Sequence, residues 1–201
     1  TLDHQSSYET SRFFIDVMPL STISVYPKYR MGVGVIRNKL IFSLDVEYGN
    51  EDLFTRYDAG ETYRFIGLRP QFRWREYFDD HSFYYVGTEF SINTLRQSES
   101  DGTFMSTAGS RLTFDSGDKE RQRLSGQIRA GLFLGLGPHF FFDLYTGIGA
   151  AVRKYSYVNL TNLRLATEEE DQGWGFSSDN SDEGVRWVLD LGLGFKVGYI
   201  F

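Results

Sequence analysis

The sequence contains no cysteine and no long uncharged stretch. Without cysteine there can be no disulfide framework and no thiolate metal site. The longest segment free of Asp, Glu, Lys and Arg is the 13 residues from Ala130 to Phe142, well short of the roughly 20 apolar residues that a membrane-spanning helix needs. A helical membrane protein is therefore excluded. The net charge of -6 comes without the concentrated basic stripe that nucleic-acid binding requires, so we expect no nucleic-acid partner.

Aromatic residues and glycines are abundant instead, with 13 Tyr, 18 Phe, 3 Trp and 21 Gly in 201 residues. The segment from Val185 to Phe201 shows how they are arranged. All nine odd-numbered positions in it are apolar or aromatic, whereas the even-numbered positions include Arg186, Asp190, Lys196 and three glycines. A period of two predicts a β-strand, because a helix would not place these residues on one face.

The same alternation recurs in seven further segments, so the sequence predicts an all-β protein. The eight predicted strands are 12–18, 23–36, 40–49, 62–75, 82–95, 123–136, 140–155 and 185–201. The links after the second, fourth and sixth strands are short, and those after the third, fifth and seventh are long, covering about 50–61, 97–120 and 156–183. All long loops therefore emerge at one end. Eight antiparallel strands can close into a barrel, which removes exposed strand edges.

The glycines indicate which face of the barrel is inside. The interior of a small barrel is crowded, and eleven of the strand glycines share a row with the charged residues, while the large Leu, Phe and Trp side chains occupy the other row. We therefore predict an eight-stranded antiparallel transmembrane β-barrel with a polar lumen and an apolar wall that faces lipid. Trp74 and Trp187 are predicted to lie in the aromatic girdles at the two membrane interfaces.

Charged residues inside a lumen must be paired. A two-residue hairpin turn at Arg37-Asn38 would place Lys28 opposite Glu47 and Arg30 opposite Asp45. The other predicted members of this network are the carboxylates Asp16, Glu89, Asp143 and Asp190 and the cations Arg69, Arg73, Arg129, Arg153, Arg186 and Lys196. Because eight strands leave an interior just filled by side chains, the network favours a closed barrel over a conducting pore.

These features resemble the small outer-membrane barrels of the OmpA/OmpX type, over 12–201. The terminal Tyr199-Ile200-Phe201 is similar to the signal read by the outer-membrane assembly machinery, which assigns that role to Tyr199 and Phe201. The run from Phe13 through Pro19 and Val25 to Tyr48-Gly49 is similar to barrels from Bacteroidetes. The resemblance implies a bacterial outer-membrane location, with membrane lipids and lipopolysaccharide as neighbours. It also implies a flexible periplasmic segment at 1–11, a single barrel domain over 12–201, periplasmic short turns and long loops outside the cell.

Candidate catalytic groups are few. The predicted topology puts His81 and His139 in short turns and His4 in the flexible terminus, so no Ser/His/acid set can form at the outer rim. We expect a protein that is not an enzyme and that needs no cofactor or resident metal.

The three long loops carry sixteen acidic and four basic residues, including the runs Glu168 to Asp171 and Asp179 to Glu183. These runs could contact a cation or a cationic partner, although solvated loops commonly carry charge and no EF-hand-like spacing is present. The leading hypothesis is a non-enzymatic outer-membrane barrel that serves as an anchor or as an accessory subunit with other envelope proteins. Two alternatives are a soluble eight-stranded barrel that carries a small hydrophobic ligand and an outer-membrane enzyme that modifies lipid.

Overall fold

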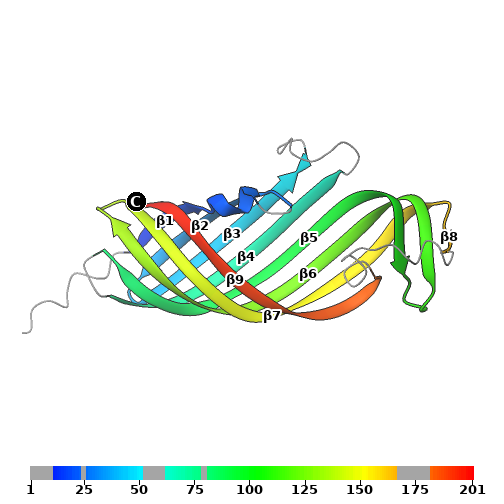
Figure 1. Ribbon diagram of the computed structural model, residues 1–201. Coiled ribbons are helices and arrows are strands. Elements are labelled where there is room, and N and C mark those ends of the chain that lie inside the picture. Colours follow the sequence, from blue (N-terminus) through cyan, green and yellow to red (C-terminus); the bar gives the residue numbers. More distant parts are fainter. Residues whose placement is uncertain (1–10, 24–25, 52–61, 78–80, 167–181) are drawn as a thin grey trace, which may run out of the picture.

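The structure is a computed structural model that describes residues 11–23, 26–51, 62–77, 81–166 and 182–201. Its strands form one antiparallel sheet whose first strand, β5, also pairs with β6, so that eight strands close into a barrel (Figure 1). The eight are β1 (Arg12–Val17), β2 (Tyr29–Arg37), β3 (Leu40–Asn50), β4 (Tyr63–Tyr77), β5 (Phe83–Met105), β6 (Arg111–Leu136), β7 (Phe140–Thr161) and β9 (Gly184–Ile200). A two-residue strand, β8 (Arg164–Leu165), is added to β6. The prediction of an eight-stranded antiparallel barrel is confirmed.

The short connections gather at one end of the barrel. The C-terminus lies at this end, on the left of Figure 1, and the long β5–β6 hairpin projects from the opposite end. Among the described residues, no helix is long and apolar enough to cross a membrane. The helical segment that is described, η1 (Pro19–Ile23), is a short 3-10 turn.

The two faces of the wall differ as the period of two predicts. Along β3 the side chains alternate strictly between the lumen and the outside. Those inside are Ile41, Ser43, Asp45, Glu47 and Gly49, and those outside are Phe42, Leu44, Val46 and Tyr48. Glycine is required where the lumen is most crowded: a Cβ on Gly32 would collide with the carboxylates of Asp16 and Asp45. From Ser43 to Tyr48 the lumen face of β3 is therefore polar and its outer face apolar.

The two candidate girdle tryptophans lie on the outer wall, toward opposite ends. Trp74 pairs with Leu40, the first residue of β3 at the short-turn end. Trp187 lies three residues after the start of β9, at the long-loop end, and its side chain is 76% exposed. Their role at lipid interfaces stays a prediction.

The lumen is not polar along its whole length. At the short-turn end it holds a buried cluster of mostly aromatic side chains. Its members are Phe14, Ile36, Ile41, Phe83, Tyr85, Phe133, Phe141, Tyr145 and Ile200. The Phe133 ring stacks between Phe83 and Phe141, with both centroid separations at 4.3 Å. Because these rings fill the section of lumen that they occupy, they close this end of the barrel.

The β2–β3 turn differs from the predicted turn by one residue. Arg37 pairs with Leu40, so the turn residues are Asn38-Lys39, and Asn38 adopts a φ of 53°, which asparagine tolerates better than most residues. The facing partner of Arg30 is consequently Glu47, and Gly32 faces Asp45. The predicted pairing of Lys28 with Glu47 was wrong. Because each partner moved by two positions, every side chain kept its face.

The predicted loop over 97–120 was also wrong, since most of it is strand. β5 and β6 continue as a paired ribbon to a tight turn between Met105 and Arg111. Phe104, Phe114 and Tyr157 pack together inside this extension, where the rings of Phe104 and Tyr157 stack 4.1 Å apart. This ribbon lies beyond the apolar part of the wall, and its outward-facing residues are polar. Apolar and polar residues therefore do not alternate along it, and the sequence pattern did not indicate strands.

Asp118 ties the three strands of this extension together on their outer face. Its Oδ2 accepts hydrogen bonds from Arg96 Nη2 at 2.7 Å and Asn159 Nδ2 at 2.8 Å, and its Oδ1 accepts one from Ser98 Oγ at 2.8 Å. These bonds, with that of Arg96 the largest cause, lower the pKa of Asp118 from its usual 3.8 to about 2. A lowered pKa means that the stabilisation is present above pH 4 and is lost as the pH falls toward 2.

Titration of the Asp118 carboxyl carbon by NMR is therefore expected to give a midpoint near 2. Arg96→Gln removes the charged donor and should move the midpoint up toward 3.8. Lys39→Gln, at the short-turn end, serves as the control and should leave the midpoint unchanged. A wild-type midpoint near 3.8 would contradict the described contacts.

The barrel closes through its shortest strand. β1 has six residues and pairs with β9 only from Phe14 to Val17, whereas β7 pairs with β9 along nearly the whole of β9. The strand predicted over 23–36 begins only at Tyr29, because the chain leaves the wall after β1. It turns through η1 and then enters the lumen, where Tyr63 Oη donates to the Pro27 carbonyl at 2.7 Å and Lys28 lies over the Phe65 ring.

Candidate functional site in the barrel lumen

A cluster of buried ion pairs occupies the middle of the lumen, on the long-loop side of the aromatic cluster. Asp45, on β3, is fully buried and accepts from Arg30 Nε and Lys196 Nζ, both at 2.7 Å, and from Gln71 Nε2 at 2.9 Å. Lys196 Nζ also lies 3.1 Å from Asp16 Oδ1. These contacts link β1, β2, β3, β4 and β9 across the seam where the barrel closes.

Glu89, on β5, binds three guanidinium groups from three other strands. Its carboxylate lies 2.9 Å from Arg30 Nη2, 2.8 Å from Arg69 Nη1 and 2.6 Å from Arg129 Nη1, and its side chain is 1% exposed. The contacts are short enough to be charge-assisted hydrogen bonds. One carboxylate therefore holds β2, β4 and β6 to β5.

A third group bridges opposite walls of the barrel. Arg73 Nη1 lies 2.7 Å from Asp143 Oδ2, and Tyr85 Oη donates to Asp143 Oδ1 at 2.6 Å. Further out, Glu47 binds Arg69 Nε at 3.0 Å. Ion pairs thus cross the lumen and join strands on different sides of it. They fill the interior and do not line an open channel.

Three predicted members of the network differ from the prediction. Asp190 is bound by Arg123, a residue that the sequence reasoning left out, and Arg186 is bound by Asp182. Arg153 has no carboxylate within 4.0 Å among the described residues, although its pairing had been expected. The other predicted members form the ion pairs described above. Lys28 is the exception, because it lies over the Phe65 ring.

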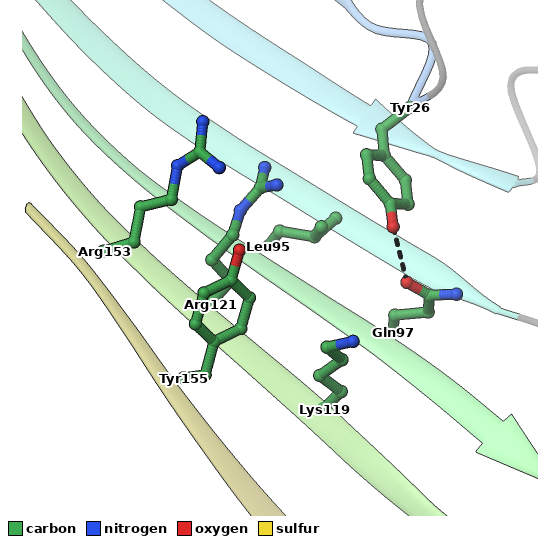
Figure 2. Close-up of a pocket in the computed structure, with 7 residues that line it drawn as sticks. All are labelled: Tyr26, Leu95, Gln97, Lys119, Arg121, Arg153 and Tyr155. Carbon is green, nitrogen blue, oxygen red and sulfur yellow. Dashed lines mark hydrogen bonds between the residues drawn. The ribbon is translucent and has the colours of Figure 1, made fainter. Parts of the chain in front are cut away.

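Beyond the ion pairs, toward the long-loop end, lies a cavity of about 310 Å³. Its lining consists of Tyr26, Leu95, Gln97, Lys119, Arg121, Arg153 and Tyr155. Figure 2 shows the Arg121 and Arg153 side chains extending from neighbouring strands with their guanidinium groups turned the same way. Tyr26 Oη donates to Gln97 Oε1 at 2.8 Å, and the Arg121 guanidinium lies over the Tyr26 ring. We name these seven residues the outer-lumen pocket.

The sequence reasoning missed the outer-lumen pocket because of one strand boundary. Lys119 and Arg121 fell in or beside the predicted loop over 97–120, so neither was assigned to the lumen row. The signal was nevertheless present, because Lys119, Arg121 and Arg123 occupy alternate positions and thus share a face of β6.

The two described histidines, His81 and His139, lie at the short-turn end, opposite the end that holds this pocket. His139 lies in the turn between β6 and β7, where its Nδ1 is 3.0 Å from the Ile200 carbonyl oxygen and its ring stacks on Tyr199. His81 lies just before β5 at the same end of the barrel. In the described parts of the chain, no group of three or more His, Asp or Glu side chains could hold a metal ion.

Tyr199 and Phe201 lie at the short-turn end, with ring centroids 5.2 Å apart. Their role as an assembly signal stays a prediction. The acidic runs Glu168 to Asp171 and Asp179 to Glu183 lie mostly outside the described residues, as does the terminal segment 1–10.

No family model and no curated protein matches this chain. Among solved structures, it is similar to Neisserial surface protein A, with a TM-score of 0.40 and 13% identity over 95% of this chain and 94% of that one. It is also similar to a major outer membrane protein from Thermus thermophilus, with a TM-score of 0.46 and 12% identity over 96% of this chain and 100% of that one. Because both scores are low, the barrel assignment rests on the strand pairing of this chain itself.

Proposed function

We propose that this chain is a β-barrel of the bacterial outer membrane that spans the bilayer as a closed, non-enzymatic barrel. The observation that carries the proposal is the exposure of large apolar side chains on the outer wall. Leu193 is 82% exposed, Ile128 is 69% exposed and Leu191 is 68% exposed, and similar residues face outward on every strand of the ring. Soluble proteins rarely expose a contiguous apolar surface of this kind to water. In a membrane barrel the same surface is in contact with lipid.

The interior supports the same proposal over a soluble carrier of a hydrophobic ligand. Such a carrier turns its apolar row inward around a cavity. Here the middle of the lumen holds Asp45, Glu89 and Lys196, each no more than 1% exposed, and the outer-lumen pocket is lined by three cations. An apolar ligand would have to displace charged groups from their partners.

We place the short turns and the segment 1–11 in the periplasm and the long-loop end outside the cell, with 12–201 as the barrel. Exposed Arg64 and Lys154 lie on the outer face just beyond the apolar rows of β4 and β7, where they suit the phosphates of lipopolysaccharide. Tyr199 and Phe201 would be read by the assembly machinery. An OmpA/OmpX-like or Bacteroidetes-type origin is part of this proposal.

We assign no catalytic role to this barrel. His81 and His139 lie at the short-turn end, opposite the rim where the proposed extracellular surface lies. The closed lumen instead suits an anchor or an accessory subunit of an envelope complex, whose acidic loops would contact partner proteins. A lipid-modifying enzyme would require a nucleophile and a base together at the outer rim.

The proposal predicts how the protein behaves on extraction. The protein should remain in the membrane fraction after washing with high salt and enter solution only with detergent. On cold gels the unboiled form should migrate differently from the boiled form, because a barrel held by continuous strand pairing resists dodecyl sulfate. Recovery of folded protein in buffer without detergent would reject the membrane location and favour the soluble alternative.

A further inference from the structure

The outer-lumen pocket carries more positive charge than its surroundings balance. Among the described residues that line it, Lys119, Arg121 and Arg153 are cationic and none is Asp or Glu. Lys119 has Glu99 at 3.4 Å, whereas neither Arg121 nor Arg153 has a carboxylate within 4.0 Å among the described residues. Within the described part of the barrel, two positive charges therefore have no counter-ion.

Strand pairing makes the position of Arg153 especially costly. It lies directly between Arg123 on β6 and Arg186 on β9, all three on the lumen face. Like charges opposite one another on neighbouring strands repel. Arg123 and Arg186 are each paired with an aspartate, so Arg153 is the member of this row that has no counter-ion among the described residues, and an anion in the pocket would supply one.

Two of the buried hydrogen-bond donors that lack a partner also belong to this pocket. Arg121 Nε and Arg153 Nε are both buried without a hydrogen-bond partner among the described residues. An orphaned buried donor is unfavourable, and the penalty is larger for a charged group. A planar guanidinium matches the oxygen spacing of a phosphate or carboxylate, so an oxyanion would satisfy these donors and supply the missing charge.

The rest of the pocket is suited to the organic part of such a ligand. Tyr26, Tyr155 and Leu95 supply two aromatic rings and an aliphatic side chain. The cavity of about 310 Å³ exceeds what a bare ion fills. Two uncompensated cations match the charge of a phosphate monoester, which is about −1.5 to −2 at neutral pH.

We propose that the outer-lumen pocket binds a phosphate monoester, with Arg121 and Arg153 holding the phosphate and Tyr26 and Tyr155 flanking its organic part. The ligand reaches the pocket from the long-loop end, because the ion pairs and aromatic cluster block the other direction. The source of the phosphate is either a soluble molecule or a lipid headgroup. This function adds to the anchoring role and holds whether or not that role is correct.

Isothermal titration calorimetry on the intact chain in a non-ionic detergent tests the proposal, with orthophosphate and phenyl phosphate as probes. Both should give saturable binding, with phenyl phosphate the tighter because its ring contacts the tyrosines. Arg121→Gln and Arg153→Gln together should weaken binding at least tenfold, and higher salt should weaken it for the wild type. Arg37→Gln is the matched control, because Arg37 is an exposed arginine at the short-turn end of β2, away from the pocket, and it should bind like the wild type.

Two results would overturn the proposal. One is the absence of saturable binding of either probe to the wild-type barrel, which needs no variant and so does not depend on variant folding. The other is equal weakening by Arg37→Gln and by the pocket variants, which would indicate attraction by overall charge. Nanodiscs of phosphatidylcholine with and without phosphatidic acid then identify the source. If phosphatidic acid competes with the phosphate probes, the ligand is a lipid headgroup. If the probes bind and phosphatidic acid does not compete, the ligand is a soluble molecule.

Discussion

Replacing Glu89 with glutamine is expected to lower the free energy of unfolding by about 3–5 kcal/mol, the usual result of removing one partner from a buried ion pair. Glu89 is the carboxylate shared by Arg30, Arg69 and Arg129. Glutamine preserves the shape but removes the negative charge. Three guanidinium groups would then repel one another in a closed space.

Urea unfolding of the barrel in lipid vesicles, followed by the mobility of unboiled samples on gels, measures the loss. Glu76→Gln is the matched control, because Glu76 also forms an ion pair, with Lys39 at 2.9 Å, but both side chains are more than half exposed. Exposed pairs contribute less than about 1 kcal/mol. If Glu89→Gln and Glu76→Gln had the same small effect, the lumen network would not hold the barrel together.

The network also explains why the barrel closes despite the short β1. Only four residues of β1 pair with β9, so the backbone seam is weak on that side. Lys196 of β9 binds Asp16 of β1 and Asp45 of β3, reaching past β1 and β2. The side chains thus bridge a seam that the hydrogen bonds of the backbone join only in part.

The faces of the wall could be predicted from sequence more securely than the ends of the strands. A period of two assigns Asp45 and Phe42 to opposite faces whatever the register, so the two-position error at the β2–β3 turn moved no side chain to the wrong face. The position of the turn itself depended on whether Arg37 or Asn38 began it. Both choices gave plausible pairs on both faces, and the structure decides between them through the pairing of Arg37 with Leu40 and the positive φ of Asn38.

Partners across the lumen were harder to predict than membership of the lumen. Alternation says that Asp190 and Arg123 point inward, but they lie on β9 and β6, which do not pair with each other in the described residues. Such contacts depend on the curvature of the barrel and on the length of each side chain. The inward path of Pro27 and Lys28 was likewise concealed, because alternation alone extended β2 back through this segment.

The outer-lumen pocket was missed for a related reason. Polar residues beyond the apolar belt were interpreted as loop, although paired strands in that region can be polar on both faces. The strand places the Arg121 side chain on the same lumen face as that of Arg153 on the neighbouring strand. The candidate binding site therefore depends on the part of the wall that continues beyond the apolar rows, which the sequence pattern did not predict.

Ile128→Arg is expected to lower the free energy of unfolding in lipid vesicles by about 2–4 kcal/mol, the cost of a cation near the bilayer midplane on the wall of a barrel. Ile128 is 69% exposed and lies near the middle of the outward row that runs from Leu124 to Leu136. On the surface of a soluble protein the same substitution would change stability by only about 0.5 kcal/mol. Gln122→Arg, on the same strand and face but beyond the apolar row, is the matched control and should cost less than about 1 kcal/mol. Equal stabilities for the two variants would mean that lipid does not cover the wall at Ile128, whereas a difference of the expected size would place this part of the wall in the hydrocarbon layer independently of any extraction experiment.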